Sequence, residues 1–245
     1  MTQQPSILVI LPMFNEEEHV GQLLADFKPV VEQELVAEVV VVDDGSTDAT
    51  PAILAEAGHC TVVTHPTNRG CGDAIRSGYR HALSFGYDVC VIMAGNGKDD
   101  PAEIERVVAP ILAGDADYVQ GSRYLPGGRS ENLPRHRNVA IRLFTWTFSL
   151  ALHRRFTDCT NGFRAYRTAV LRDERIGWDQ DWLGPGYELE YYMHYRVAQL
   201  GYRVQEVPVS KVYRQARAAS HTKVRPRDWL TILRPLVYLR LGLKR

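Results

Sequence analysis

Five short polar segments in this chain hold the residue types that bind phosphates, sugar hydroxyls and cations. They are 12–16 (PMFNE), 43–46 (DDGS), 68–72 (NRGCG), 96–100 (NGKDD) and 121–124 (GSRY). Carboxylate and amide oxygens accept hydrogen bonds from hydroxyl and ring N–H groups, arginine and lysine bind phosphate oxygens, and glycine lets the backbone approach a ligand closely. If the fold brings these segments together, they predict a binding site for a polar, charged small molecule.

The sequence around these segments predicts that they do meet. Each segment closely follows a run rich in aliphatic and β-branched residues, as in strands buried on both faces; the runs are 7–11, 38–42, 60–64, 88–93 and 118–121. Helices are expected to begin at Asn15, Thr50, Asp73 and Asp100. This alternation indicates an α/β fold, an open and mostly parallel sheet with helices on both faces, whose strands end at one common edge.

The second half of the chain has a different pattern. Helices are expected over 138–152 and 187–200, and a short strand over 202–208. Residues 226–245 mix Leu, Ile and Trp with Arg and Lys, which predicts a basic amphipathic helix able to lie on an anionic membrane. A helix docked on the protein core or on a second subunit is the rival interpretation. We therefore divide the chain into a main domain, 1–225, and a C-terminal tail, 226–245.

Composition excludes some classes of protein. The 245 residues contain 29 Lys and Arg against 29 Asp and Glu, so a nucleic-acid partner has no electrostatic support. The four cysteines form no Cys-x-x-Cys pair, which indicates reduced thiols. No secretory leader and no run of 18 apolar residues is found in the sequence. We expect a cytoplasmic protein, at most peripheral on the cytoplasmic face of a membrane.

The motifs PMFNE, VVVVDDGSTDAT, NRGCGDAIRSGYRHA, GSRY and DCTNGFRAYR resemble the family 2 glycosyltransferases of the GT-A fold. The resemblance covers about residues 5–225 and is closest to the dolichol- or polyprenyl-phosphate mannose and glucose synthases. It implies that the main domain is catalytic. The implied reaction moves a sugar from a nucleoside-diphosphate sugar to a polyprenyl phosphate, with inversion at the anomeric carbon.

The resemblance also implies which residues bind the donor. They belong to all five polar segments: Pro12, Phe14, Glu16, Asp43, Asp44, Asn68, Gly70, Asn96 and Arg123. Asp43 has a second interpretation, as a cap of the turn at Gly45 and Ser46. The third segment is not a dinucleotide fingerprint, because Ile75 stands where the third glycine is due.

One motif departs from the family. Ala94, Gly95 and Asn96 stand where relatives carry the Asp-x-Asp pair that holds a divalent metal on the donor diphosphate. Two arrangements stay open. In one, Asn96 and Asp99 hold Mg²⁺ or Mn²⁺ together with the donor phosphates. In the other, Lys98 and Arg123 supply fixed positive charge to the leaving diphosphate.

The acceptor side is implied by the later motifs. Lys98, Arg123 and Asp158 are the candidate catalytic residues, with a turn cap or an ion pair with Arg164 as the second interpretation of Asp158. The other candidates on the acceptor side are Arg164, Glu188, Arg214 and Lys223. Only one of Glu188 and Glu190 is expected to face the cleft, because residues two apart on a helix point in different directions.

Two other functions remain as alternatives. The first is transfer to a soluble sugar or natural-product acceptor, and the second is a nucleotide-sugar-binding protein without turnover. For the preferred function the partners are a nucleoside-diphosphate sugar, a polyprenyl phosphate and a membrane surface or membrane subunit, without nucleic acid.

Overall fold

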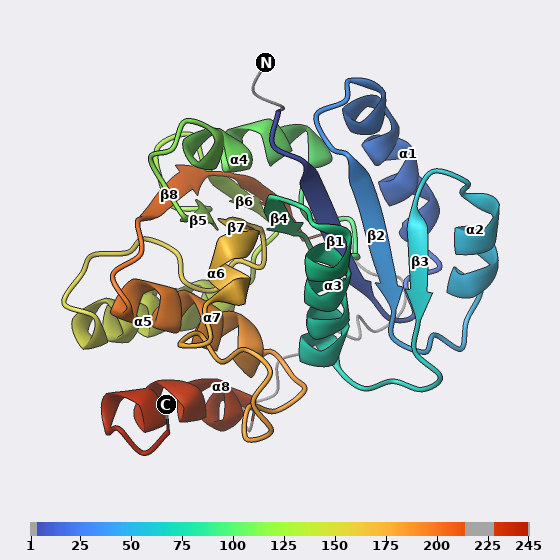
Figure 1. The fold of residues 1–245 in the computed structure, drawn as a ribbon. Coiled ribbons are helices and arrows are strands. Elements are labelled where there is room, and N and C mark those ends of the chain that lie inside the picture. The colour runs from blue at the N-terminus through green and yellow to red at the C-terminus, as the bar shows by residue number, and fades with distance from the viewer. Residues whose placement is uncertain (1–3, 214–227, 245) are drawn as a thin grey trace.

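A seven-stranded sheet forms the centre of the molecule (Figure 1). The structure is a computed structural model, and it describes residues 4–213 and 228–244. In chain order its strands are β1 (Ile7–Met13), β2 (Glu38–Asp43), β3 (Thr61–Thr64), β4 (Val89–Ile92), β5 (Tyr118–Ser122), β7 (Arg164–Arg167) and β8 (Val204–Pro208). Their spatial order is β3-β2-β1-β4-β7-β5-β8, and β7 alone runs antiparallel to its neighbours. A second, two-stranded sheet pairs β6 (Arg129–Glu131) with β9 (Ser210–Val212).

Helices cover both faces of the sheet. One face packs against α1 (Val20–Glu32), α2 (Thr50–Glu56) and α4 (Ile104–Leu112), the last preceded by the 3₁₀ turn η1 (Pro101–Glu103). The other packs against α3 (Cys71–Phe85), α5 (Arg135–Ala151), α6 (Thr168–Arg172), α7 (Glu188–Gln199) and α8 (Asp228–Arg240). Strand β1 shows why: Leu8 and Ile10 enter one core while Val9 and Leu11 enter the other. Successive side chains of a strand point to opposite faces, so an unbroken aliphatic run fills both cores.

The α/β class and the mostly parallel sheet are confirmed, and each of the five predicted strands is present. The helix predicted from Asn15 begins only at Val20. Asn15 has a φ of 52°, outside the helical region, and the amides of His19 and Val20 both donate to the carbonyl of Glu16. Residues 14–17 are instead a turn tied to the segment after β2, since the amide of Asn15 donates to Ser46 Oγ at 2.9 Å.

Strand β7 was not expected from the sequence. It inserts between β4 and β5, so the fourth and fifth strands are not neighbours. Four residues are too few to show a hydrophobic period, and two of the four, Arg164 and Arg167, are charged.

The C-terminal helix α8 packs against α7. Ile232, Leu236 and Leu239 are buried in the core on that side. This packing favours the interpretation of α8 as a docked helix, and its membrane contact stays a prediction. Within 4–213 and 228–244, no helix has the length and apolar character needed to cross a bilayer.

A missing side chain at Gly78 lets α3 lie close on β1. A Cβ atom placed there would lie 2.3 Å from Cγ2 of Ile10, whereas one placed at Gly21 on α1 meets nothing within 4 Å. We expect Gly78→Ala to lower the free energy of unfolding by roughly 1–3 kcal/mol through overpacking. Gly21→Ala should be neutral or slightly stabilising, because alanine favours a helix. Urea denaturation of both variants tests this, and equal midpoints would contradict it.

Candidate active site

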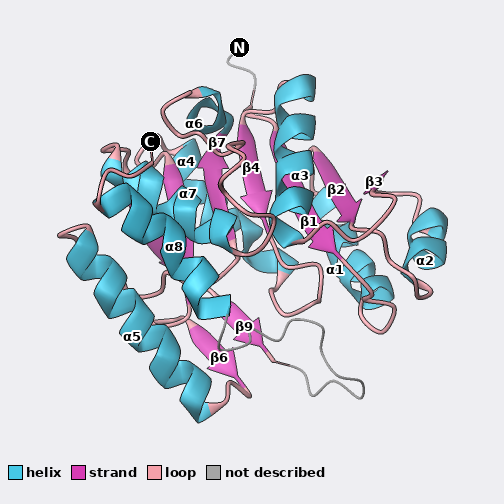
Figure 2. Cartoon of the chain, turned by 90° about the horizontal axis from the view of Figure 1, so that it is seen from below, coloured by secondary structure: helices cyan, strands magenta, loops and turns pink. Residues whose placement is uncertain are grey.

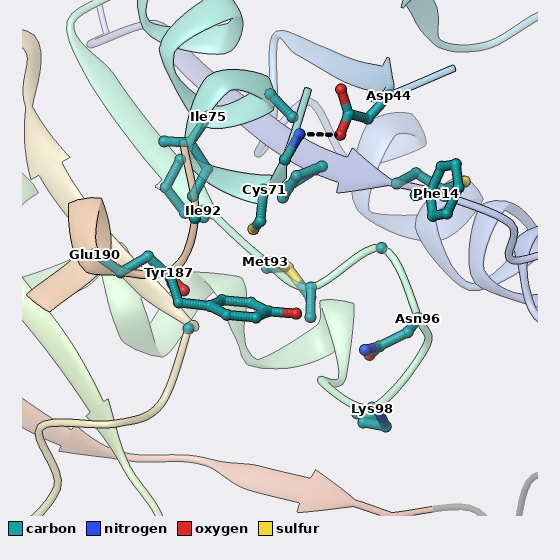
Figure 3. A pocket seen from close by; sticks show the side chains of 18 of the residues that line it. Phe14, Asp44, Cys71, Ile75, Ile92, Met93, Asn96, Lys98, Tyr187 and Glu190 are labelled. Carbon is teal, nitrogen blue, oxygen red and sulfur yellow. Dashed lines mark hydrogen bonds between the residues drawn. The ribbon is translucent and has the colours of Figure 1, made fainter. Parts of the chain in front are cut away.

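A cavity of about 370 Å³ lies at the carboxyl ends of β1 and β4 (Figure 3). The turn after β1 contributes Pro12, Phe14 and Glu16 to its lining. The segments after β2, β3 and β4 contribute Asp44, Asn68, Gly70, Asn96 and Lys98. Four of the five polar segments therefore converge as predicted from their places at strand ends. The fifth, after β5, does not reach the lining.

Asp44 organises the loop that opens α3. Its carboxylate accepts hydrogen bonds from the amides of Arg69 and Gly70 at 2.9 and 2.7 Å, and it contacts His65 Nδ1 at 2.6 Å. Gly70 has a φ of 104°, and a Cβ there would lie 2.6 Å from the carbonyl oxygen of Pro185. The carboxylate is thus held by the protein, and it fixes the backbone that forms one wall of the cavity.

Asp43 has a different environment. One carboxylate oxygen accepts from the amide of Ser46 at 3.0 Å, which is the geometry of a turn cap. The other is buried and has no hydrogen-bond partner within the described residues. Asp43 is not among the residues that line the cavity.

Glu16 is a partly buried carboxylate inside the cavity. Burial raises the pKa of its carboxyl group to about 7; Lys98 opposes this rise, whereas Asp48 and Glu18 add to it. A carboxyl group that titrates near neutrality is poised to change its charge beside a bound ligand.

The turn after β4 carries a cluster of charged and amide groups. Lys211 Nζ lies 2.6 Å from Asp99 Oδ1 and 3.1 Å from Asn161 Oδ1. The second Asp99 oxygen accepts from the amide of Ala94 at 3.2 Å. The Oδ1 atom of Asn96 is buried without a partner within the described residues.

Lys98 and Lys211 both line the cavity beside this cluster. The two segments that carry these lysines are joined by a backbone hydrogen bond, which the amide of Val212 donates to the carbonyl of Lys98 at 2.9 Å. Burial and then the positive charge of Lys211 lower the pKa of the Lys98 ammonium, while Glu16 raises it in part. The ammonium of Lys98 has no hydrogen bond or ion pair within the described part of the chain, so its charge is available to a ligand.

Arg123 and Asp158 form a buried bidentate ion pair. Arg123 Nε lies 2.7 Å from Asp158 Oδ2, and Nη2 lies 2.8 Å from Oδ1. The guanidinium also donates to Thr160 Oγ1 and to the hydroxyl of Tyr213. Thr160 and Tyr213 line the cavity, whereas Arg123 and Asp158 do not. The ion pair expected between Asp158 and Arg164 is therefore made with Arg123 instead.

The first turn of α7 carries the two glutamates considered from the sequence. Glu190 lines the cavity, and its carboxylate lies 3.3 Å from the buried guanidinium of Arg164. Glu188 is buried away from the lining and pairs with Arg234 of α8 at 3.8 Å. One of the two faces the cavity, as the helical spacing requires, and it is Glu190 rather than Glu188.

Several lining residues were not identified from the sequence. Besides Lys211, they include Arg137 at the start of α5, Tyr187 before α7, and Tyr213. Figure 3 shows Tyr187 extending across the cavity between Glu190 and the turn with Asn96 and Lys98. The run RHR at 135–137 was a visible signal, but a single sequence does not show which elements approach one another. Two predicted residues of the acceptor side, Arg214 and Lys223, lie outside the described residues.

The pKa of Glu16 predicts a pH dependence of stability. The folded protein keeps this proton up to about pH 7, whereas the unfolded chain releases it near 4.5. The native state therefore binds more protons in this window, and the free energy of unfolding falls as the pH rises through it. We expect Glu16→Gln to flatten this fall, in urea denaturation between pH 4.5 and 8. Glu56→Gln, at an exposed position on α2, should keep the wild-type slope; parallel curves for Glu16→Gln and wild type would contradict the assignment.

Comparisons with known proteins agree with this geometry. Residues 8–175 match the family described as Glycosyl transferase family 2. The chain is 35% identical over 218 residues to an undecaprenyl-phosphate mannosyltransferase of Micrococcus luteus, covering 85% of this chain and 84% of that protein. It is 32% identical over 213 residues to polyprenol monophosphomannose synthase of Mycolicibacterium smegmatis, covering 85% and 78%.

The fold also has a solved counterpart. The structure of glucosyl-3-phosphoglycerate synthase from Mycobacterium tuberculosis, in complex with Mn²⁺ and UDP-glucose, matches with a TM-score of 0.67 at 22% identity. The match covers 98% of this chain and 80% of that one. At this identity the likeness concerns the fold, which is that of the GT-A enzymes. A family match over more than half of the chain, together with relatives above 30% identity, shows that the chain belongs to glycosyl transferase family 2 and is a glycosyltransferase.

Proposed function

We propose that this enzyme transfers a sugar from a nucleoside-diphosphate sugar to a polyprenyl phosphate, with inversion at the anomeric carbon. The observation that carries the proposal is the similarity to two polyprenyl-phosphate mannosyltransferases over 85% of the chain. The cavity supports it, since aromatic residues, carboxylates and the cations Lys98, Lys211 and Arg137 all line it. Such an enzyme acts at the cytoplasmic face of a membrane, where its lipid acceptor lies.

We propose one orientation for the donor in the cavity. Pro12, Phe14 and the loop held by Asp44 form the wall for the nucleoside, and Lys98 and Lys211 lie where the diphosphate would be. The amide oxygen of Asn96 is an unused acceptor on the same side, suited to a sugar hydroxyl. The acceptor phosphate would then enter from the side of Arg137 and Tyr213, which also line the cavity.

The reaction needs charge stabilisation more than proton transfer. An oxygen of the acceptor phosphate forms a bond to the anomeric carbon while the bond from that carbon to the diphosphate oxygen breaks. The phosphate is already anionic, so no proton has to move. The carboxylate of Glu190 is bound to Arg164 and is not required as a base. The enzyme aligns the two reactants and stabilises the charge on the departing diphosphate.

The side chains near the diphosphate do not fit a divalent metal well. Both oxygens of Asp99 are engaged, one by Lys211 and one by a backbone amide. Asn96 offers one neutral oxygen, and no group of three or more His, Cys, Asp or Glu is gathered for a metal in the described ranges. The solved counterpart, by contrast, is in complex with Mn²⁺ and UDP-glucose. In this chain we propose that Lys98 provides fixed positive charge to the leaving diphosphate. Lys211 supports it, in the role that the sequence had suggested for Arg123.

The acceptor can be tested with short prenyl phosphates that dissolve in water. A thermal-shift panel of GDP-, UDP-, CDP- and dTDP-sugars first identifies the donor, because a ligand of the native state raises its apparent stability. We then expect turnover with the prenyl phosphate and at least about 100-fold less with the matching prenyl alcohol, which needs a general base. Transfer to soluble sugars but not to prenyl phosphate would support the soluble-acceptor alternative. Donor binding without turnover on any acceptor would indicate a binding protein.

The two lysines give a separate prediction. Lys98→Ala should raise the activation barrier by roughly 2–4 kcal/mol while changing donor affinity less, because the ammonium acts on charge that develops in the transition state. Activity should persist in EDTA. Lys28→Ala, which removes an exposed ion pair with Glu32, serves as the control. Activity abolished by EDTA, with a near-normal rate for Lys98→Ala, would overturn the fixed-charge proposal.

A further inference from the structure

Helix α5 presents apolar side chains to solvent as well as to the core. Ile141, Phe144 and Phe148 are buried on its inner side. On its outer side a stripe of four large apolar residues remains exposed: Val139 (65%), Leu143 (60%), Trp146 (60%) and Leu150 (54%). Their spacing of i, i+4, i+7 and i+11 places them on one face of the helix. Single exposed apolar residues are ordinary, but a continuous stripe over about three turns marks an interaction surface.

The charge around this stripe has one sign. The segment 132–157 contains five arginines and no Asp or Glu; the arginines are Arg135, Arg137, Arg142, Arg154 and Arg155. Arg137 and Arg142 stack over the rings of Tyr213 and Tyr124 rather than on carboxylates. The whole chain is formally neutral, so this local excess of positive charge is a property of the surface and not of the composition.

The stripe begins close in the chain to the active-site cavity. Arg137, in the first turn of α5, lines the cavity two residues before the stripe begins. Figure 2 views the molecule from below, and α5 and α8 both lie on the side facing the viewer. Val237 of α8 and Leu241, directly after it, are also exposed apolar residues.

We propose that the outer face of α5 is a docking surface for an anionic lipid bilayer. An apolar stripe that includes a tryptophan, flanked by arginines, has the composition of a helix that lies in the plane of a membrane interface. The bilayer would bring its phosphate-bearing lipids to the end of the helix where Arg137 meets the cavity. This inference rests on the proposed acceptor for its purpose, but the docking itself can be measured without any reaction.

The positive charge of the outer face of α5 distinguishes between a second copy of this chain and an anionic bilayer as the partner that covers it. A second copy of this chain that docked through the same face would place the same arginines opposite one another, and like charges in contact are unfavourable. An anionic bilayer instead contributes favourable free energy for each nearby arginine in addition to the apolar burial. The bilayer is thus the occupant that satisfies both the stripe and the arginines.

Vesicle co-sedimentation of the full chain tests the docking surface. We expect binding to phosphatidylglycerol-rich vesicles, weak binding to phosphatidylcholine vesicles, and loss of binding at high salt. Leu143→Ser combined with Trp146→Ser should lower the partition coefficient roughly tenfold or more, since large apolar side chains contribute at least about this factor on leaving water. Phe85→Ser, which removes an equally exposed residue (71%) at the far end of α3, is the matched control and should bind as wild type.

Turnover separates this inference from the proposed function. The double variant should keep wild-type rates on a short prenyl phosphate in solution and lose them on a long-chain acceptor in vesicles. Equal vesicle binding of wild type and double variant would overturn the docking surface while leaving the function untouched. Failure of wild type to use any prenyl phosphate would overturn the function, and the co-sedimentation result would still stand. If neither protein binds vesicles, and the wild type is a dimer while the double variant is a monomer, the outer face of α5 is a self-association surface instead.

Discussion

A buried ion pair between Arg123 and Asp158 fixes the second half of the active site. Arg123 follows β5 and Asp158 precedes β7, so the pair joins two parts of the chain 35 residues apart. The amide of Asp158 donates to Glu206 of β8, and the guanidinium holds Thr160 and Tyr213 at the cavity wall. Burying two charges adds little net stability, but leaving one without the other costs several kcal/mol. The arrangement of these segments is therefore closely constrained.

The cavity places opposite charges at short range, and this sets its chemistry. Burial and the nearby charge of Lys211 lower the pKa of the Lys98 ammonium, while Asp99 pairs with Lys211 at 2.6 Å. Glu16 titrates near pH 7 because burial disfavours its charged form. Charges that are partly shielded from water act more strongly on a diphosphate than charges on an open surface. This is the basis of the proposal that the two lysines act on the leaving diphosphate.

The active site and the apolar surface of α5 are parts of one arrangement. Arg137 belongs to both, since it lines the cavity and begins the helix that carries the exposed stripe. The proposed lipid acceptor has a charged head and a long apolar chain, and an enzyme that uses it must receive the head without extracting the chain from the bilayer. A helix with a charged first turn at the cavity and an apolar outer face meets both requirements.

Local patterns in the sequence were sufficient to predict the parallel strands of the sheet, most helices and the convergence of four polar segments at one edge of the sheet. Unbroken aliphatic runs belong to strands buried on both faces, and parallel strands end at one edge, so Glu16, Asp44, Asn68 and Lys98 had to converge. The tertiary structure decided the rest. It inserted β7 beside β4, paired Arg123 with Asp158, brought Lys211 and Arg137 to the cavity, and turned Glu190 inward. These outcomes depend on contacts between residues that are distant in the chain. A periodic pattern predicts only the helix or strand in which it occurs, not which other elements pack against it.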